Sequence, residues 1–467
     1  MRRCLLLAGF LPAFLPMGRT VAAQTGPAPA RLTLDDAVRL ALRQNPTVRA
    51  ELARRDETDA LVRAAWANRG PVIENALVVQ GNPNRPAAVL PGALFGPGSG
   101  PQVVRLGSTY ESNATTSLRL PLFDPARSAA VTVARADRTE AEVALARVRD
   151  EVGARTRDAY VALVEARAQR RAAEATATWR ALEATNRRAL ATSGRANTAD
   201  RDAAALEADD ARLAADQARL AERAARARLA AVLGLVLERE DGEERLEPAD
   251  DITTLVAQVM TDTLPPPEQP SLAVREAEAA EAAARTRIAV ERRGAWPTLS
   301  FVAASSWLGF ADAFNDLATS RAQFQRTSIG VELTWARSDF GARSARVRAL
   351  DAAYRRTAAR REEAEVEAAA ARAVAWADRA AALVQVRLAE RTRTLARERV
   401  VLLQASNDAG RAIGANVARE TARVAEAEAA VARAMRTFLQ RDTDARRLSG
   451  ASVLRTGTTA VAMEGTR

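Results

Sequence analysis

The sequence contains no histidine and a single cysteine, and only 4% of its 467 residues are aromatic. The one thiol, Cys4, lies in a predicted leader. The mature chain therefore has no imidazole base, no thiol nucleophile, no disulfide and no typical zinc ligands. Paired carboxylates such as Asp209-Asp210 and Glu362-Glu363 are neighbours in helical sequence, so they diverge around the helix axis. These features argue against an enzyme and predict no cofactor and no bound metal.

Lysine is also missing, so all 68 basic residues are arginine, against 58 acidic residues and a formal net charge of +10. The arginines alternate with Asp and Glu at almost every helical turn, and no basic stretch carries interleaved aromatics. This pattern is typical of solvated helix surfaces and predicts no nucleic-acid partner.

The first residues have the pattern of a secretory signal. Arg2-Arg3 precede an apolar core from Leu5 to Leu15, and Val21-Ala22-Ala23 form a small-residue cleavage site. Residues 1–23 are therefore predicted to be a signal peptide, with an uncleaved anchor as the alternative. Phe10 stands where a lipoprotein would need its acylated cysteine.

The rest of the chain divides into two similar halves. Ala126-Arg127-Ser128-Ala129 and Gly194-Arg195-Ala196 recur 216 residues later, as Ala342-Arg343-Ser344-Ala345 and Gly410-Arg411-Ala412, and Tyr160 and Trp376 keep the same offset. Each half reads helix, strand, loop, strand, long helix, turn, helix. The predicted order is a first repeat at 24–237, an acidic Pro-rich linker at 238–270, a second repeat at 271–440 and a flexible C-terminal tail at 441–467.

The elements of each repeat follow from periodicity and from turn residues. One opening helix is predicted from Thr33 to about Asn68. The first repeat then has strands at about 72–80 and 108–122 around a plain loop, a long helix at 128–192, a tip turn at 193–198 and a helix at 199–233. The second has a helix from about Leu272 to Arg293, strands at about 298–310 and 327–335, a long helix at 342–409, a tip at 410–414 and a helix at 415–440.

The strands alternate cleanly between apolar and polar residues. One predicted face carries Ala114, Thr116, Leu118, Leu120 and Leu122, and in the last strand Ile329, Val331, Leu333 and Trp335 share a face. Four strands cannot enclose a pore, because small closed barrels need about eight. Their open edges therefore predict oligomerisation.

The long helices are rich in alanine. In the second one, a coiled-coil seam is predicted along Val366, Ala370, Ala373, Ala377, Ala380 and Val384. A helix of about 65 residues is roughly 100 Å long, and two shorter helices stacked end to end would match it.

The sequence resembles the TolC family of outer-membrane efflux and secretion channels. The resemblance rests on the opening phrase from Leu32 to Asn45-Pro46, on Leu120-Pro121-Leu122-Phe123-Asp124, on Gly410-Arg411 and on the duplicated layout. It implies a mainly α fold in which long coiled-coil hairpins form two repeats. Four antiparallel strands per subunit would build one shared trimeric outer-membrane β-barrel, and the linker would lie at the equator of a periplasmic extension.

The resemblance also implies partners and sites. A homotrimer would dock to a periplasmic adaptor (a membrane fusion protein) and to an inner-membrane transporter such as an RND pump, and outer-membrane lipid would surround the strands. The predicted docking tips are Gly194, Arg195, Ala196, Asn197, Gly410, Arg411, Ala412, Ile413 and Gly414. The predicted periplasmic constriction comprises Asp200, Asp202, Asn416 and Arg419, and the predicted membrane-interface aromatics are Trp296, Trp307 and Trp335.

The constriction departs from the family pattern, because Asn416 and Arg419 stand where relatives typically carry acidic residues. Our hypothesis is therefore a mixed ring that favours anions or forms salt-bridged gates.

The predicted role is a passive exit duct for small toxic compounds or metal ions. A type I protein-secretion duct and a soluble periplasmic coiled-coil scaffold remain as alternatives.

Overall fold

The structure is a computed structural model that describes residues 31–84, 87–91, 94, 96–97, 100–105, 109–235, 246–250, 254–257, 270–318, 324–335, 339–408 and 414–450. The predicted signal peptide, most of the predicted linker and the last seventeen residues of the predicted tail lie outside these ranges.

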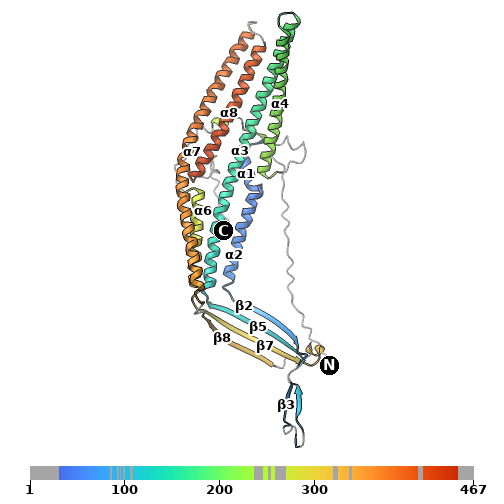
Figure 1. Cartoon of the computed structure of the whole chain (residues 1–467), viewed down its shortest axis with the longest axis vertical. Coiled ribbons are helices and arrows are strands. Elements are labelled where there is room, and N and C mark those ends of the chain that lie inside the picture. Colours follow the sequence, from blue (N-terminus) through green and yellow to red (C-terminus); the bar gives the residue numbers. More distant parts are fainter. Residues whose placement is uncertain are drawn as a thin grey trace.

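Long helices form a tall, narrow wall with a sheet at one end (Figure 1). The helices are α1 (Leu34–Gln44), α2 (Pro46–Ala67), α3 (Pro125–Thr192), α4 (Thr198–Leu233), α6 (Leu272–Arg293), α7 (Ala342–Asp408) and α8 (Gly414–Leu448). No helix in the described part of the chain is long and apolar enough to cross a membrane.

The main sheet has four antiparallel strands in the order β2-β5-β7-β8. These strands are β2 (Val72–Gly81), β5 (Tyr110–Phe123), β7 (Thr298–Ala311) and β8 (Phe324–Thr334). The short strands β1 (Arg31–Leu32) and β6 (Glu247–Pro248) pair in parallel, and a short 3-10 helix, η3 (Phe314–Ala318), follows β7. The predicted mainly α fold with four antiparallel strands is confirmed.

The layers of the wall share one lateral order. At the tip end, α7 packs on α8, α8 on α3, and α3 on α4; towards the sheet, α7 packs on α6, α6 on α3, and α3 on α2. In every layer, a second-repeat element (α7 or β8) therefore lies at one edge and a first-repeat element (α4, α2 or β2) at the other.

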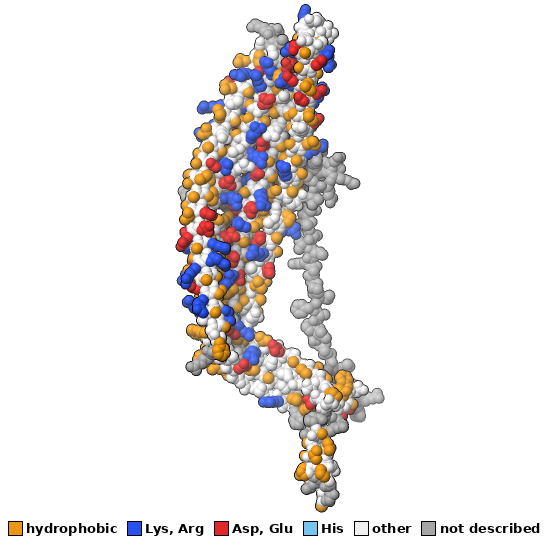
Figure 2. Space-filling model, in the orientation of Figure 1, with side chains coloured by type: hydrophobic (Ala, Val, Ile, Leu, Met, Phe, Trp, Pro, Cys, Tyr) orange, Lys and Arg blue, Asp and Glu red, His pale blue; other side chains and the backbone are white. Residues whose placement is uncertain are grey.

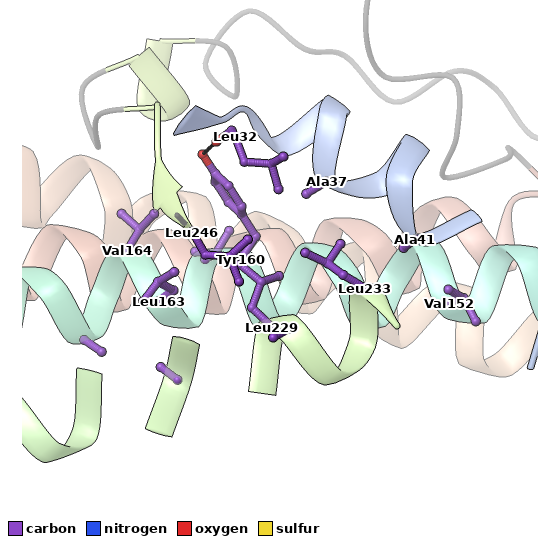
Figure 3. Packing of buried hydrophobic residues seen from close by; sticks show 14 of the residues in the cluster. Leu32, Ala37, Ala41, Val152, Tyr160, Leu163, Val164, Leu229, Leu233 and Leu246 are labelled. Carbon is purple, nitrogen blue, oxygen red and sulfur yellow. Dashed lines mark hydrogen bonds between the residues drawn. The ribbon is translucent and has the colours of Figure 1, made fainter. Parts of the chain in front are cut away.

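The main core lies where α1, α3 and α4 meet the paired strands β1 and β6, around the fully buried Tyr160 of α3 (Figure 3). The Tyr160 hydroxyl donates to the Leu32 carbonyl at 2.9 Å and lies 3.0 Å from an Asp250 carboxylate oxygen. The same Asp250 oxygen accepts from the Leu34 backbone N–H at 2.8 Å. One tyrosine thus joins the start of the described chain to the segment between the repeats. Burial raises the pKa of this phenol, so it stays protonated and able to donate.

The opening helix was predicted as one element, but it is two, broken at Asn45. The Asn45 side chain accepts from the Thr47 N–H at 2.9 Å and so caps α2, while Pro46 takes the first helical position. The same side chain donates to the Val232 carbonyl of α4 at 2.7 Å. The break therefore fixes the point where the end of α4 meets the junction of α1 and α2.

The loop predicted between the first two strands contains a hairpin, β3 (Ala87–Leu90) paired with β4 (Gln102–Arg105), which projects beyond the main sheet in Figure 1. Each of these strands has only four residues, which is too short for an alternating pattern to stand out in a sequence rich in proline and glycine.

The predicted tail begins too early, because residues 441–448 continue α8. Asp442 and Arg446 are both buried there, and the Asp442 carboxylate pairs with Arg379 of α7 and with Arg446, each at 2.6 Å. The charges of Asp442, Arg379 and Arg446 therefore pair with one another inside the wall.

The predicted alanine seam of α7 is also wrong within one subunit. Its end residues Val366 and Val384 are 70% and 62% exposed, and the residues between them are exposed as well. The line that α7 buries is Ala368, Ala375, Ala382 and Val386.

Candidate functional site

The strand register divides the side chains of the main sheet into two faces, because directly paired residues point the same way. One face, called here the uncharged face, carries Ile73, Leu77 and Val79 of β2, Ala114, Leu118 and Leu120 of β5, Phe301, Ala303 and Trp307 of β7, and Ile329, Val331 and Leu333 of β8. A polar row crosses its middle: Asn75, Thr116, Ser305 and Thr327. That row is bonded internally, as by Thr116 to Asn75 at 2.8 Å.

Every charged residue of these four strands lies on the opposite face, called here the charged face: Glu74, Glu111, Arg119, Arg326 and Glu332. Arg119 and Glu332 form an ion pair at 3.0 Å across it. The uncharged face is nevertheless exposed in the single chain; Leu77 is 70% and Ile329 72% exposed. A sheet with one exposed face free of charge and one charged face suits a boundary between lipid and water.

The alternation predicted for β5 fails at its end. A bulge after Pro121 makes Leu122 the extra residue and sets Phe123 opposite Leu299, so Phe123 takes the place on the uncharged face that was assigned to Leu122.

The predicted aromatics lie towards the ends of the sheet. Thr298 and Thr334 are register partners, so Trp296 and Trp335 flank the end nearest the helices, and the Phe123 ring lies 6.3 Å from that of Trp296. Trp307 lies on the uncharged face nearer the far end. There Tyr110 and Phe314 stack edge to face at 5.7 Å. Phe123 and Tyr110 were missed because they adjoin a bulge and a turn, where periodicity carries no signal.

At the other end of the wall, the first tip is a turn that Gly194 closes. Gly194 has φ +71°; its N–H donates to the Ala191 carbonyl at 3.0 Å and the next N–H, of Arg195, to the Leu190 carbonyl at 2.8 Å. Asn197 caps α4 by accepting from the Ala199 N–H at 3.2 Å, and Ala196 lies between. In the second tip, Gly410, Arg411, Ala412 and Ile413 lie outside the described residues, and Gly414 begins α8.

The predicted constriction residues occupy the first turns of two helices that α3 separates. On α4, Asp200 is exposed, and Asp202 pairs with Arg201 at 2.8 Å, whose hydrogen bond lowers the pKa of Asp202. On α8, Asn416 is half-buried and Arg419 lies 3.9 Å from Glu420. One subunit therefore does not bring the four residues together.

Glu420 was not predicted as a functional residue, although it lies at this place. It is buried, and it also accepts a hydrogen bond from Arg423 at 2.5 Å. Two arginines thus share one carboxylate at the start of α8. The i, i+3 spacing of Glu420 and Arg423 could have revealed this pair.

Among the described residues, no group of three or more His, Cys, Asp or Glu side chains is placed to hold a metal ion. The features that stand out are extended surfaces: the two-faced sheet and the long helical wall. Figure 2 shows charged side chains spread over the helices and few over the sheet.

No protein-family model and no curated protein sequence matches this chain. Solved structures do. The outer membrane protein VceC from Vibrio cholerae is 15% identical, with a TM-score of 0.62 over 90% of this chain and 96% of its own. The outer membrane channel CmeC from Campylobacter jejuni is 12% identical, with a TM-score of 0.66 over 89% of this chain and 85% of its own.

The outer membrane channel MtrE from Neisseria gonorrhoeae, in its open state, is 17% identical, with a TM-score of 0.59 over 93% of this chain and 95% of its own. In each case the likeness spans the wall and the sheet together. The chain therefore has the fold of these outer-membrane channels, which is the TolC-like fold that its opening phrase and duplicated layout predicted.

Proposed function

We propose that this protein is an outer-membrane channel subunit that serves as the passive exit duct of a tripartite efflux system, with a periplasmic adaptor and an inner-membrane pump. The observation that carries the proposal is that a sheet with one exposed, uncharged face continues into a helical wall. That wall is long enough to reach from one membrane towards another. The sheet suits a bilayer on its uncharged face and water on its charged face. A helix of the length of α3, 68 residues, extends roughly 100 Å.

The dimensions of the sheet fit a bilayer. Trp307 lies nine residues after Thr298, the first residue of β7, or about 31 Å along an extended strand at ~3.4 Å per residue. At the tilt of about 40–45° usual in membrane barrels, that stretch spans roughly 22–23 Å, close to the height of an apolar band between two aromatic girdles. Trp296, Trp307 and Trp335 are therefore proposed as interface anchors, with Phe123 added to the girdle near the helices.

The oligomer follows from the edges. In the single chain, β2 and β8 leave their outer backbone groups without a strand partner in the described sheet, and a membrane tolerates no open edge of this kind. β2 and β8 run in opposite directions, so β8 of one copy can extend the sheet at β2 of the next without changing the antiparallel pattern. Three copies would supply twelve strands to one closed barrel, and the same closure would roll the helical walls into a tunnel.

The tips are the proposed docking surface for the adaptor, and Asp200, Asp202, Asn416 and Arg419 the proposed constriction. With Glu420 accepting from Arg423 and lying near Arg419, the start of α8 carries one net positive charge from these three residues. Together with Asp200 and Asp202, which pairs with Arg201, these residues would form a mixed ring of both signs and not a purely acidic one. The expected cargo is small toxic compounds or metal ions, and protein secretion is the alternative duct function.

Membrane fractionation tests the proposal. Inner and outer membranes of a producing cell are separated, and the outer fraction is run in mild detergent with and without heating. The expected result is a trimer in the outer-membrane fraction that heat dissociates. A monomer recovered in the soluble periplasmic fraction would replace the channel with a coiled-coil scaffold.

Cargo class is tested separately by deleting the gene and measuring the lowest inhibitory concentrations of dyes, detergents and metal salts. Sensitisation to such compounds supports efflux. Unchanged sensitivity together with loss of a secreted protein from the medium would instead support protein secretion.

A further inference from the structure

Helix α4 carries a stripe of leucines that nothing in the described part of the single subunit covers. Leu206, Leu213 and Leu220 follow one another at seven-residue spacing and are 58–64% exposed. The side that α4 buries is different: Ala208 and Ala215, also seven apart, are buried where α4 packs on α3. Seven-residue spacing keeps side chains on one side of a supercoiled helix. Helix α4 therefore has one seam of alanines that is buried against α3 and a second seam of leucines that is exposed.

Helix α7 repeats this arrangement. Its buried line of alanines packs within the wall, while Leu388, Leu395 and Leu402, again seven residues apart, are 58–71% exposed. The line continues towards the sheet through Ala381 to the exposed Val374. Leucine is the residue that an antiparallel or parallel coiled coil places in its seam, and an exposed run of it on a charged helix is otherwise unfavourable.

The two stripes cannot meet inside one subunit. In the order α7-α8-α3-α4, the helices α4 and α7 form the opposite edges of the wall, and Figure 1 shows them on its two sides. They would meet only between neighbouring copies, at the same edges where β2 and β8 end the sheet.

Their spacing from the tips matches to within two residues. Leu206 lies eight residues after the first residue of α4, Thr198, and Leu402 lies six residues before Asp408, the last residue of α7 that the structure describes. The chain leaves the tip along α4 and approaches it along α7, so the two helices are antiparallel. Level pairing therefore sets Leu206 opposite Leu402, Leu213 opposite Leu395 and Leu220 opposite Leu388, and it brings Ala227 opposite Ala381.

Of the charged pairs that this register would form beside the stripes, one is attractive and the next is repulsive. Asp209 falls level with Arg399, whereas Asp210 falls level with Glu398. Exposed pairs of this kind contribute little, and here their effects oppose each other. The leucines therefore decide the register, because they supply most of the area that the contact would bury.

We propose that α4 of one subunit and α7 of the next form an antiparallel leucine zipper at the tip end of the wall, with Leu206, Leu213 and Leu220 against Leu402, Leu395 and Leu388. The proposal rests on the homotrimer proposed above and adds the surface that joins its subunits far from the membrane. Its partner is a second copy of this chain.

Cysteine cross-linking tests the register without background, because the only native cysteine, Cys4, lies in the predicted signal peptide. Leu206→Cys and Leu402→Cys are combined in one chain, and the membranes are treated with a short thiol-specific cross-linker. The expected result is a ladder of covalent dimer and trimer on a denaturing gel. Each single variant is expected to stay monomeric on the denaturing gel. The zipper pairs α4 of one subunit with α7 of the next, so a single cysteine would have no second cysteine opposite it.

The matched control combines Leu206→Cys with Leu388→Cys. This pair uses the same two helices but is displaced by fourteen residues, or about 21 Å along the axis, beyond the reach of the reagent. Cross-linking of this pair, or of Leu206→Cys with Leu395→Cys in place of the level pair, would overturn the register. A heat-labile trimer without any cross-link at these positions would overturn the zipper and leave the channel proposal standing.

A second measurement guards against a variant that misfolds. Leu213→Glu is expected to lower the temperature at which the unheated trimer band disappears. Leu190→Glu, on α3 near the tip and 40% exposed, makes the same chemical change away from both stripes and is expected to leave that temperature unchanged. Equal losses in the two variants would count against the zipper.

Discussion

At the residue scale, Tyr160 is the largest fully buried side chain among the described residues, and it lies in the main core. Its hydroxyl holds the Leu32 carbonyl and Asp250, so it joins three segments that are distant in sequence. Tyr160→Phe keeps the ring but leaves those acceptors without this donor, and we expect a loss of about 1–2 kcal/mol in the free energy of unfolding. Tyr354→Phe is the matched control, since that hydroxyl is only half-buried and donates to the Glu281 carboxylate at 3.2 Å. Thermal unfolding in detergent, followed by circular dichroism, would separate the two; equal shifts would contradict the role given to Tyr160.

Asp36 provides a test of pH dependence at the same scale. Hydrogen bonds from the Thr33 hydroxyl, at 2.6 Å, and from Arg39 lower the pKa of Asp36 at the start of α1. An acid with a lowered folded-state pKa stabilises the fold above its ordinary pKa of about 3.9, and this contribution disappears as the pH falls through the folded-state value.

Asp36→Asn is therefore expected to destabilise at pH 7 by less than about 1 kcal/mol, because the site is partly exposed to solvent. Near pH 3 and below, the stabilities of variant and wild type should converge. Asp35→Asn makes the same charge change in the same helical turn without removing the bond to Thr33. A difference from wild type that stays constant from pH 7 to pH 3 would show that ionised Asp36 contributes nothing.

At the scale of the elements, the end of α4 depends on one glycine. Gly234 has φ +75°, and a Cβ there would lie 2.9 Å from the Gln44 backbone oxygen at the break between α1 and α2. Gly234→Ala combines a left-handed backbone with a backbone clash, so we expect a loss of at least about 2 kcal/mol. Gly194→Ala is the comparison, because that glycine is also left-handed, with φ +71°, but has open space around it. Unfolding curves that shift equally for both variants would mean that the approach to Gln44 does not matter.

The sequence predicts some elements well for reasons that the structure makes plain. Alternation assigns the faces of the strands, because the charged residues keep to one face of the sheet. Asp124-Pro125 starts α3 through a side-chain cap and a first-turn proline. Periodicity fails on α7. Alanine repeats there on more than one side of the helix, so spacing alone cannot show that Ala375 and Ala382 are buried in the wall while Ala380 is not. The bulge after Pro121 and the double role of Asn45 depend on distant strands and helices, which no local pattern contains.

In the candidate site, too, local turn residues were predictable from the sequence, whereas residues that depend on helix packing were not. Gly194 and Asn197 were predicted as turn residues, and the first tip explains them through a left-handed glycine and a helix cap. Glu420 and the exposed leucine stripes needed the packing of whole helices, since burial decides which of several equivalent spacings is used.

At the scale of the whole molecule, the three layers of the wall end in the same two edges. The sheet ends in β2 and β8, the lower helices in α2 and α7, and the upper helices in α4 and α7. A single contact between copies would therefore close the strands, the lower helices and the tips at once. This shared order is what the proposed trimer would need for its copies to form one continuous tube wall.

The same scale gives the sharpest test of the membrane boundary. Leu118 and Ser117 are neighbours on the central strand β5, and the register places Leu118 on the uncharged face and Ser117 on the charged face, opposite Glu74. Leu118→Arg would put a charge into lipid near the middle of the sheet, at a cost of about 2–4 kcal/mol per subunit, whereas Ser117→Arg would point into water beside a carboxylate. We expect the heat-labile trimer in the outer-membrane fraction to be lost in Leu118→Arg and kept in Ser117→Arg. If the two arginines had the same effect, or if only Ser117→Arg were lost, the uncharged face could not be the one that contacts lipid.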